Sequence, residues 1–159
     1  MTQSSKSAGR TPGHTTVHVL NAGLVPAAVA TWVEIQLIAL HQVAGSRLRR
    51  VTVQLVNDST MQSMHAQHLN NPATTDVLSF VDGDEVDIAV CVDEAMRRCG
   101  ELGHDLGREV LLYSLHGMLH AMGFDDRTPM AHARMHAEED RLLGLVGIAA
   151  TFAPKAGEA

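Results

Sequence analysis

The chain has 159 residues, of which 45% are hydrophobic and 19% are charged, and its formal net charge is −6. This length and this ordinary globular balance predict one domain, long enough to bury about two-thirds of its unfolded surface. The negative charge excludes a general electrostatic attraction to nucleic acid, so a polyanion would have to bind a local basic patch. The densest such patch is formed by Arg47, Arg49 and Arg50.

Targeting and redox features are sparse. Cys91 and Cys99 form no CxxC pair and predict no disulfide scaffold, which fits a reducing cytoplasm. Residues 1–13 are polar and contain no apolar segment of a signal peptide. No apolar run reaches the length of about 18 residues that a membrane span needs. We therefore expect a cytoplasmic protein with a disordered tail over 1–13, one domain over 14–150 and a short tail over 151–159.

Periodicity, caps and turn residues predict the secondary structure. In chain order we expect a strand over 15–20, a helix over 27–43, a strand over 50–56, a helix capped by Asp58 or Ser59 and ending at about 69, strands over 77–81 and 87–92, and helices over 93–102, 108–122 and 129–145. Asp93 is the expected N-cap of the third helix, and Gly103 its end. This order predicts an α+β fold in which a small mixed sheet of about four strands is covered by helices.

The helix predicted over 108–122 carries the chemistry. At 100° per residue, one apolar stripe forms its core face: Leu111, Leu112, Leu115, Leu119 and Met122. His116 and His120 lie just off the edge of this stripe, one turn apart, and Glu109 lies on the same flank two turns earlier. Two imidazoles at this spacing can chelate one ion, although two half-buried histidines bonded to neighbouring groups would show the same spacing.

The residues around the two histidines favour a hydrolytic metal site. Gly123 can adopt a left-handed conformation and turn the chain back, which would present Asp125 or Asp126 to the ion. Two histidines and one carboxylate with an open position describe a catalytic zinc site, in which metal-bound water acts as the nucleophile. Gly117 stands where the HExxH motif of metalloproteases has its glutamate, so the general base of that mechanism is missing.

Several motifs in the right order resemble the YbeY family of metal-dependent endoribonucleases. HGMLHAMGFDD at 116–126 resembles the family signature HGxLHLxGYDH, and residues 75–80 match the family stretch TDVLSF letter for letter. Residues 87–90 resemble its GDIxI strand, and Arg108-Glu109 stands where many members carry an Arg-Glu pair. The resemblance covers roughly residues 50–145.

The resemblance implies a single-strand-specific endoribonuclease that acts in rRNA maturation, at the 3′ end of 16S rRNA, and in ribosome quality control. The implied partners are rRNA, the small ribosomal subunit and ribosome-associated assembly factors, with neither DNA nor a membrane among them. Two alternatives stay open, because this chain departs from the family pattern at its metal site and at one arginine. They are another metal-dependent hydrolase and a ribosome-assembly factor without catalytic activity.

The resemblance assigns His116 and His120 as the first two ligands of one divalent metal ion, with Zn²⁺ as the favoured ion. The third ligand position aligns with Asp126, where the family usually has histidine. A carboxylate there binds zinc at a similar distance but makes the site harder. A second pair four residues apart, His132 and His136, is an alternative source of the third ligand.

Further residues are candidates for proton transfer and for substrate contacts. Glu109 and Asp125 are candidate proton acceptors, and Asp125 is also a candidate for orienting the loop. The candidate substrate-binding residues are Thr75, Asp76, Ser79, Arg47, Arg49 and Arg50. Where family members often carry an arginine, this chain has Leu69, so His65 or His68 is considered for the phosphate contact. Each of these residues also has a plain structural interpretation, as a turn, strand or helix-surface position.

Overall fold

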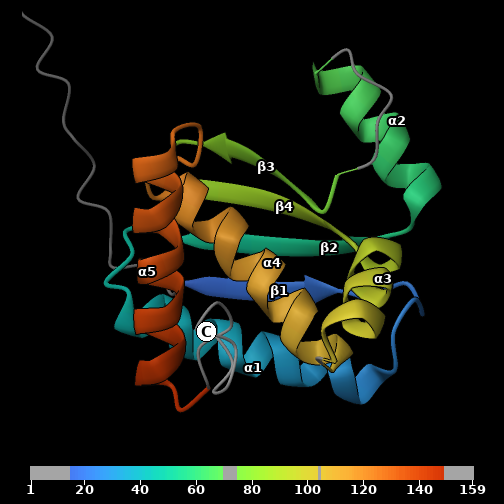
Figure 1. The fold of residues 1–159 in the computed structure, drawn as a ribbon, viewed down its shortest axis with the longest axis horizontal. Helices are drawn as coiled ribbons and strands as arrows, with labels where there is room; N and C mark the ends of the chain where they lie inside the picture. Colours follow the sequence, from blue (N-terminus) through green and yellow to red (C-terminus); the bar gives the residue numbers. More distant parts are fainter. Residues whose placement is uncertain (1–14, 70–74, 104, 149–159) are drawn as a thin grey trace, which may run out of the picture.

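The computed structural model describes residues 15–69, 75–103 and 105–148, without the side chains of residues 68 and 69. Its elements are β1 (Thr16–Leu20), α1 (Ala27–Val43), β2 (Arg50–Val56), α2 (Asp58–Leu69), β3 (Val77–Asp82), β4 (Glu85–Cys91), α3 (Val92–Leu102), α4 (Leu106–Ala121) and α5 (Pro129–Leu145). The predicted α+β fold and the predicted order of elements are confirmed (Figure 1). The tails predicted over 1–13 and 151–159 lie outside the described residues.

The sheet is mixed, with strand order β1-β2-β4-β3. β1, β2 and β4 are parallel, and β3 is an edge strand that pairs antiparallel with β4. The two-residue turn between β3 and β4 contains Gly83 at φ 59°, a conformation that glycine adopts without steric cost. In this register Ser79 of β3 lies opposite Ile88 of β4, and both side chains face α4.

The two faces of the sheet differ in how they are covered. On one face, alternate residues such as Val53 and Ile88 join the main core with α1, α4 and α5. On the other face, a smaller cluster brings Met61 of α2 against Ala89 and Cys91. In Figure 1, α2 extends away from the sheet, whereas α4 crosses it between α3 and α5. Side chains of a strand alternate between the two faces of the sheet. Helix α4 and its two histidines therefore lie over the face that α1 and α5 also cover.

Helix α4 is buried on almost every side. The predicted stripe is confirmed for its four leucines, but Glu109, Ser114 and Gly117 are buried as well. The reason is that α1, α3, α5 and the sheet all pack against this helix, which leaves it no broad solvent face. The helix also begins earlier than predicted, at Leu106, because the side chain of Asp105 caps it by accepting a hydrogen bond from the backbone N–H of Arg108.

Gly117 allows α4 to approach the sheet closely. A Cβ atom at this position would lie 2.7 Å from Cγ2 of Ile88 and 2.9 Å from Oγ of Ser79, distances that real Cβ atoms do not tolerate. The Ser79 hydroxyl also donates a hydrogen bond to the carbonyl oxygen of Gly117 (3.0 Å). Gly117, which stands where metalloproteases have their catalytic glutamate, thus also sets the distance of the two histidines from the sheet.

The start of α3 differs from the sequence-based prediction. The helix begins at Val92 after Cys91, so Asp93 lies in its first turn and is not the N-cap. The Asp93 carboxylate instead accepts a hydrogen bond from the backbone N–H of Asp58 at the start of α2 (2.8 Å). A long-range contact has replaced the local cap, which sequence periodicity does not reveal. The predicted end is confirmed, with Gly103 in the left-handed conformation at φ 68°.

None of the helices in the described ranges is long and apolar enough to cross a membrane.

Candidate metal centre

Three side chains converge at the C-terminal end of α4. The Nε2 atoms of His116 and His120 lie 3.1 Å apart, and an Asp126 carboxylate oxygen lies 3.3 Å from the first and 3.6 Å from the second. Within the part of the chain that the structure describes, this is the only group of three or more His, Cys, Asp or Glu side chains close enough to share one ion. All three are partly buried, with 19%, 32% and 34% of the side chains exposed.

The loop after α4 brings Asp126 back to the helix. Gly123 adopts φ 104°, and the backbone N–H groups of Gly123 and Phe124 bond to the carbonyl oxygens of His120 and Leu119. This left-handed turn reverses the chain, as glycine at this position permits. The predicted reversal is confirmed, and it places Asp126 next to the histidines.

Asp125 is directed elsewhere. Its carboxylate accepts hydrogen bonds from the backbone N–H and the guanidinium of Arg127, at 2.9 and 3.1 Å. The side-chain hydrogen bond from Arg127 lowers the pKa of the Asp125 carboxyl, which makes this group a weaker proton acceptor. The geometry therefore gives Asp125 a loop-holding contact, as one of the two sequence-based interpretations predicted.

The hydrogen bonds on the far side of each imidazole determine which nitrogen faces the cluster. Nδ1 of His116 lies 2.7 Å from Oε1 of Glu139, and Nδ1 of His120 lies 3.1 Å from the carbonyl oxygen of Phe124. A carboxylate and a carbonyl oxygen can only accept, so each Nδ1 carries the proton of its neutral ring. Both Nε2 atoms then present lone pairs to each other and to Asp126.

This donor set fits a divalent ion. When both rings are neutral and protonated on Nδ1, three acceptor atoms face one another, an arrangement that a cation at its centre would stabilise. For zinc, bond lengths of 2.0–2.2 Å place two ligand atoms of a tetrahedral site about 3.3 Å apart. The three separations of 3.1, 3.3 and 3.6 Å scatter around this value. The two nitrogens and one oxygen would hold the ion, with a fourth position left for water or substrate.

Charge around His116 is strongly negative. Burial by itself lowers the pKa of His116, but the hydrogen bond to Glu139 and the charges of Glu139, Asp126 and Asp76 outweigh it, so the pKa is raised. The same negative field that holds a proton on this imidazole also favours a metal cation. Asp76, which was predicted at the substrate site, therefore lies close enough for its charge to act on the metal centre.

Sequence reasoning missed Glu139. This residue of α5 is 0% exposed, and its two carboxylate oxygens contact Nδ1 of His116 and Nδ1 of His136. A signal was present, because Glu139 falls on the same helical face as Met135, Leu142 and Leu143, which form the apolar side of α5. A carboxylate on an apolar helix face is rarely buried unless it is paired.

His132 and His136 do not join the ligand group. Their Nε2 atoms lie 2.7 Å apart, and His136 contacts Glu139 at 3.1 Å through Nδ1. His132 is exposed and His136 is partly buried. The pair therefore lies behind Glu139, on the side away from the His116 Nε2 atom.

The remaining predicted site residues are distributed around α4 and the sheet. Glu109 is 2% exposed near the start of α4, and the structure does not bring it to the ligand group. Its backbone position is two helical turns before His116, about 10 Å along the helix axis. Thr75 and Ser79 are half-buried; the hydroxyl of Thr75 points to the Asp76 carboxylate at 3.4 Å.

The basic residues lie at the end of the sheet where β2 begins. Arg47 is exposed, Arg49 is half-buried, and Arg50 forms an ion pair with Glu85 of β4 at 2.8 Å. Figure 1 shows the loop after α4 at this same end of the sheet, where β3 ends. The side chains of His68, which was considered for the phosphate contact, and of Leu69 lie outside those that the structure describes.

His65 does not have the surface position that its sequence allowed. It is buried, with 8% of its surface exposed, on the side of α2 that packs towards the sheet.

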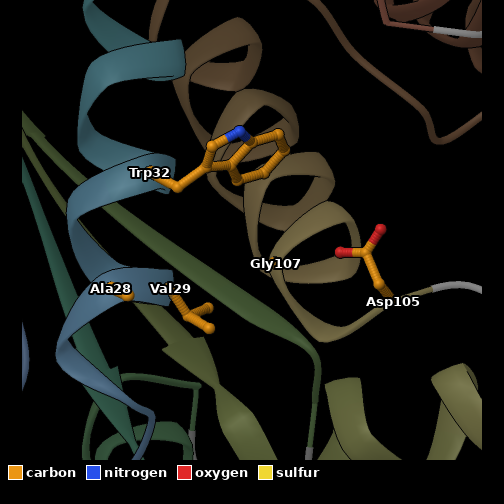
Figure 2. A pocket seen from close by; sticks show the side chains of 5 residues that line it. All are labelled: Ala28, Val29, Trp32, Asp105 and Gly107. Atoms are coloured by element: carbon orange, nitrogen blue, oxygen red, sulfur yellow. The ribbon is translucent and has the colours of Figure 1, made fainter.

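A pocket of about 410 Å³ lies far from the metal centre (Figure 2). It is lined by Ala28, Val29, Trp32, Asp105 and Gly107, between α1 and the N-terminal end of α4. Gly107 and His116 are nine residues apart on one helix, which corresponds to about 14 Å along its axis. The pocket and the ligand group are therefore separate features of the molecule.

Comparison with known proteins identifies the family. The family model described as Endoribonuclease YbeY matches residues 24–147. Among relatives named endoribonuclease YbeY, that of Roseiflexus castenholzii is 31% identical over 144 residues, covering 82% of this chain and 86% of that protein. The relative from Moorella thermoacetica is 33% identical over 126 residues (69% and 80%), and that from Deinococcus radiodurans 39% over 113 residues (65% and 70%).

The fold has a solved counterpart as well. The solution structure of TM1509 from Thermotoga maritima superposes with a TM-score of 0.56 at 21% sequence identity, covering 82% of this chain and 91% of that one. This likeness supports the arrangement of the sheet and helices. The resemblance predicted from the motifs is confirmed by the match over residues 24–147, which is well over half of the sequence: the chain belongs to the endoribonuclease YbeY family.

Proposed function

We propose that this chain is a metal-dependent, single-strand-specific endoribonuclease that acts in rRNA maturation, at the 3′ end of 16S rRNA, and in ribosome quality control. Family membership supports the endoribonuclease activity. The observation that carries the metal dependence is the convergence of three potential ligand atoms from His116, His120 and Asp126.

The three ligand residues have distinct tasks in this proposal. His116 and His120 supply neutral nitrogens whose orientation is fixed by Glu139 and by the Phe124 carbonyl. Asp126 supplies an oxygen and a negative charge from a loop, so it also closes the site. When bound, a divalent ion supplies Lewis acidity and an activated water near neutral pH. We propose Zn²⁺ as that ion, because two nitrogens and one oxygen at these separations suit it.

A substrate path follows from the positions of the basic residues. RNA that enters at the end of the sheet where β2 begins would meet Arg47 and Arg49. It would also meet Arg50 if this side chain left Glu85 to bind a phosphate. Ser79 lies on the α4 side of β3, and Thr75 and Asp76 directly precede this strand; the three residues are proposed to shape the site around the RNA. Because few basic side chains lie on this path and the net charge is −6, binding to free RNA should be weak and strongly salt-dependent.

If binding to free RNA is weak, a partner that holds the RNA near the site is needed. We propose that the small ribosomal subunit and its assembly factors present the rRNA, which implies a cytoplasmic location. The test is to compare cleavage of precursor 16S rRNA free in solution with cleavage in isolated small subunits. Faster cleavage in the subunit is expected; equal rates would remove the need for a ribosomal partner.

The central experiment measures cleavage of a labelled single-stranded RNA by the zinc-loaded protein. Activity should be lost on chelation and in His116→Ala, and it should persist in His132→Ala, the matched histidine on α5. A duplex of the same sequence should be cleaved much more slowly. Cleavage that survives His116→Ala would contradict a reaction at this site. Zinc binding without RNA cleavage would favour one of the two alternatives, another metal-dependent hydrolase or an assembly factor whose metal is structural.

A further inference from the structure

Helix α5 supplies a fully buried carboxylate to the metal centre. Glu139 is 0% exposed, and both of its oxygens are used: Oε1 lies 2.7 Å from Nδ1 of His116 and Oε2 lies 3.1 Å from Nδ1 of His136. Burying a charged carboxylate is costly unless hydrogen bonds compensate it. Packing against the core needs no charge at this position, because the neighbours Met135, Leu142 and Leu143 provide an apolar face.

The contacts form a chain from the protein surface to a ligand atom. Since Glu139 only accepts, His116 and His136 both carry their protons on Nδ1. In this tautomer His136 Nε2 accepts a hydrogen bond from Nε2–H of His132, and the 2.7 Å between these atoms is a hydrogen-bond distance. One chain of bonds therefore runs from exposed His132 through His136 and Glu139 to His116, and it fixes each tautomer in turn.

We propose that Glu139 is a positioning residue of the metal centre, and that His136 holds Glu139 in place. Glu139 locks His116 in the tautomer that presents the Nε2 lone pair, prevents rotation of its ring, and makes that nitrogen a stronger electron donor. Such carboxylate contacts to a ligating histidine typically raise metal affinity about 10–100-fold. This inference rests on the proposed metal site, and it assigns to α5 a part in the chemistry that its sequence spacing did not reveal.

The decisive comparison is Glu139→Gln against Glu138→Gln. Both changes replace a carboxylate by an amide of the same size on α5, but Glu138 pairs with Arg141 on the surface. We expect Glu139→Gln to weaken zinc binding, measured by competition with a chromogenic chelator, by at least about 10-fold. Glu138→Gln should bind like the wild-type protein. The visible spectrum of bound Co²⁺ should change in Glu139→Gln only, because it reports the geometry and donor strength of the ligands.

A second measurement needs no variant and no metal. In the metal-free wild-type protein, ¹⁵N-detected NMR of the imidazoles, at a pH where they are neutral, should show His116 protonated on Nδ1. A proton on Nε2 of His116 would overturn the proposal, even if the Glu139 variant did not fold. Equal zinc affinity in Glu139→Gln and the wild-type protein would overturn it as well. If the wild-type protein bound no zinc, the proposed metal-dependent function would fail instead, so the two failures are distinguishable.

Discussion

Helices α4 and α5 each carry two histidines four residues apart: His116 and His120 on the first, His132 and His136 on the second. The spacing is the same, but the surroundings differ. On α4 both Nδ1 atoms bond to acceptors and both Nε2 atoms face a carboxylate, so a cation between the neutral rings and the carboxylate would be stabilised. On α5 the two rings can satisfy each other by one hydrogen bond. The acceptors behind the rings, and not the spacing, therefore distinguish a metal site from a pair of hydrogen-bonded histidines.

The strongest test of this contrast removes one histidine from each helix. His120→Ala should reduce zinc affinity by more than about 100-fold, because losing a ligand costs more than losing its hydrogen-bond partner. His132→Ala should change it by only a few-fold, since His132 lies three contacts away from the His116 ligand atom. Isothermal titration of both variants with zinc measures the difference. Similar losses in the two variants would show that α5 supplies a ligand.

The two helices also differ in packing, and their glycines test this. Gly117→Ala on α4 should destabilise the fold by about 1–3 kcal/mol, because its Cβ would overlap Ile88 and Ser79. Gly144→Ala on α5, where no atom lies within 4 Å of the new Cβ, should be neutral or stabilising by up to about 1 kcal/mol. Urea unfolding of the metal-free protein compares them. Equal stability of the two variants would mean that α4 can move away from the sheet at little cost.

Changing the loop ligand sharpens the comparison, because it makes the α4 site an all-histidine site. Asp126→His should retain one ion and shift the preference towards Zn²⁺ over Mn²⁺ by roughly 10-fold, since imidazole is a softer and neutral ligand. Asp126→Ala should lose most of the bound metal. Elemental analysis after dialysis against both ions gives the ratio. Full metal content in Asp126→Ala, together with its loss in His132→Ala, would prove the proposed ligand set wrong.

The smallest expected effect on stability is at the surface ion pair between Arg97 and Asp58, a carboxylate more exposed than that of Glu139. The hydrogen bond from Arg97 lowers the pKa of Asp58 from 3.8 to about 2. A lowered carboxyl pKa stabilises the fold above the usual value, and this contribution disappears as the pH falls towards about 2. Arg97→Ala should therefore melt slightly below the wild-type protein at neutral pH and together with it near pH 2.

Solvent screening keeps this last difference small, because the side chains of Arg97 and Asp58 are 48% and 36% exposed. Thermal melts at several pH values measure it. A gap between the two melting temperatures that widened in acid would contradict the assigned direction of the Asp58 pKa.

Much of the fold followed from local sequence features. The bounds of α1, β2 and α5 were predicted to the residue, because strong periodicity and a proline near the start of each helix identify them. The facing of β3 was predicted as well, with Val77 and Ser79 on one side and Leu78 on the other. Each of these features depends on residues that are neighbours in the chain.

The errors came from contacts between distant residues. Asp93 was expected to cap α3 but bonds instead to the backbone of Asp58, 35 residues away. Glu109, whose role as a proton acceptor stays a prediction, is buried where an exposed flank was expected, because α4 is surrounded on nearly every side. Neither outcome is visible in a helical pattern, which registers the direction of a side chain and not what packs against it.

For the metal centre, the sequence by itself determined the two histidines, the glycine turn and Asp126, because they lie within 11 consecutive residues whose geometry is local. Only the tertiary structure decided which nitrogen of His116 faces the site. That choice depends on Glu139, which is 23 residues further along the chain and reaches the imidazole because α5 packs against α4. The candidate ligands lie within one motif, whereas the orientation of the His116 ring arises from the packing of two helices.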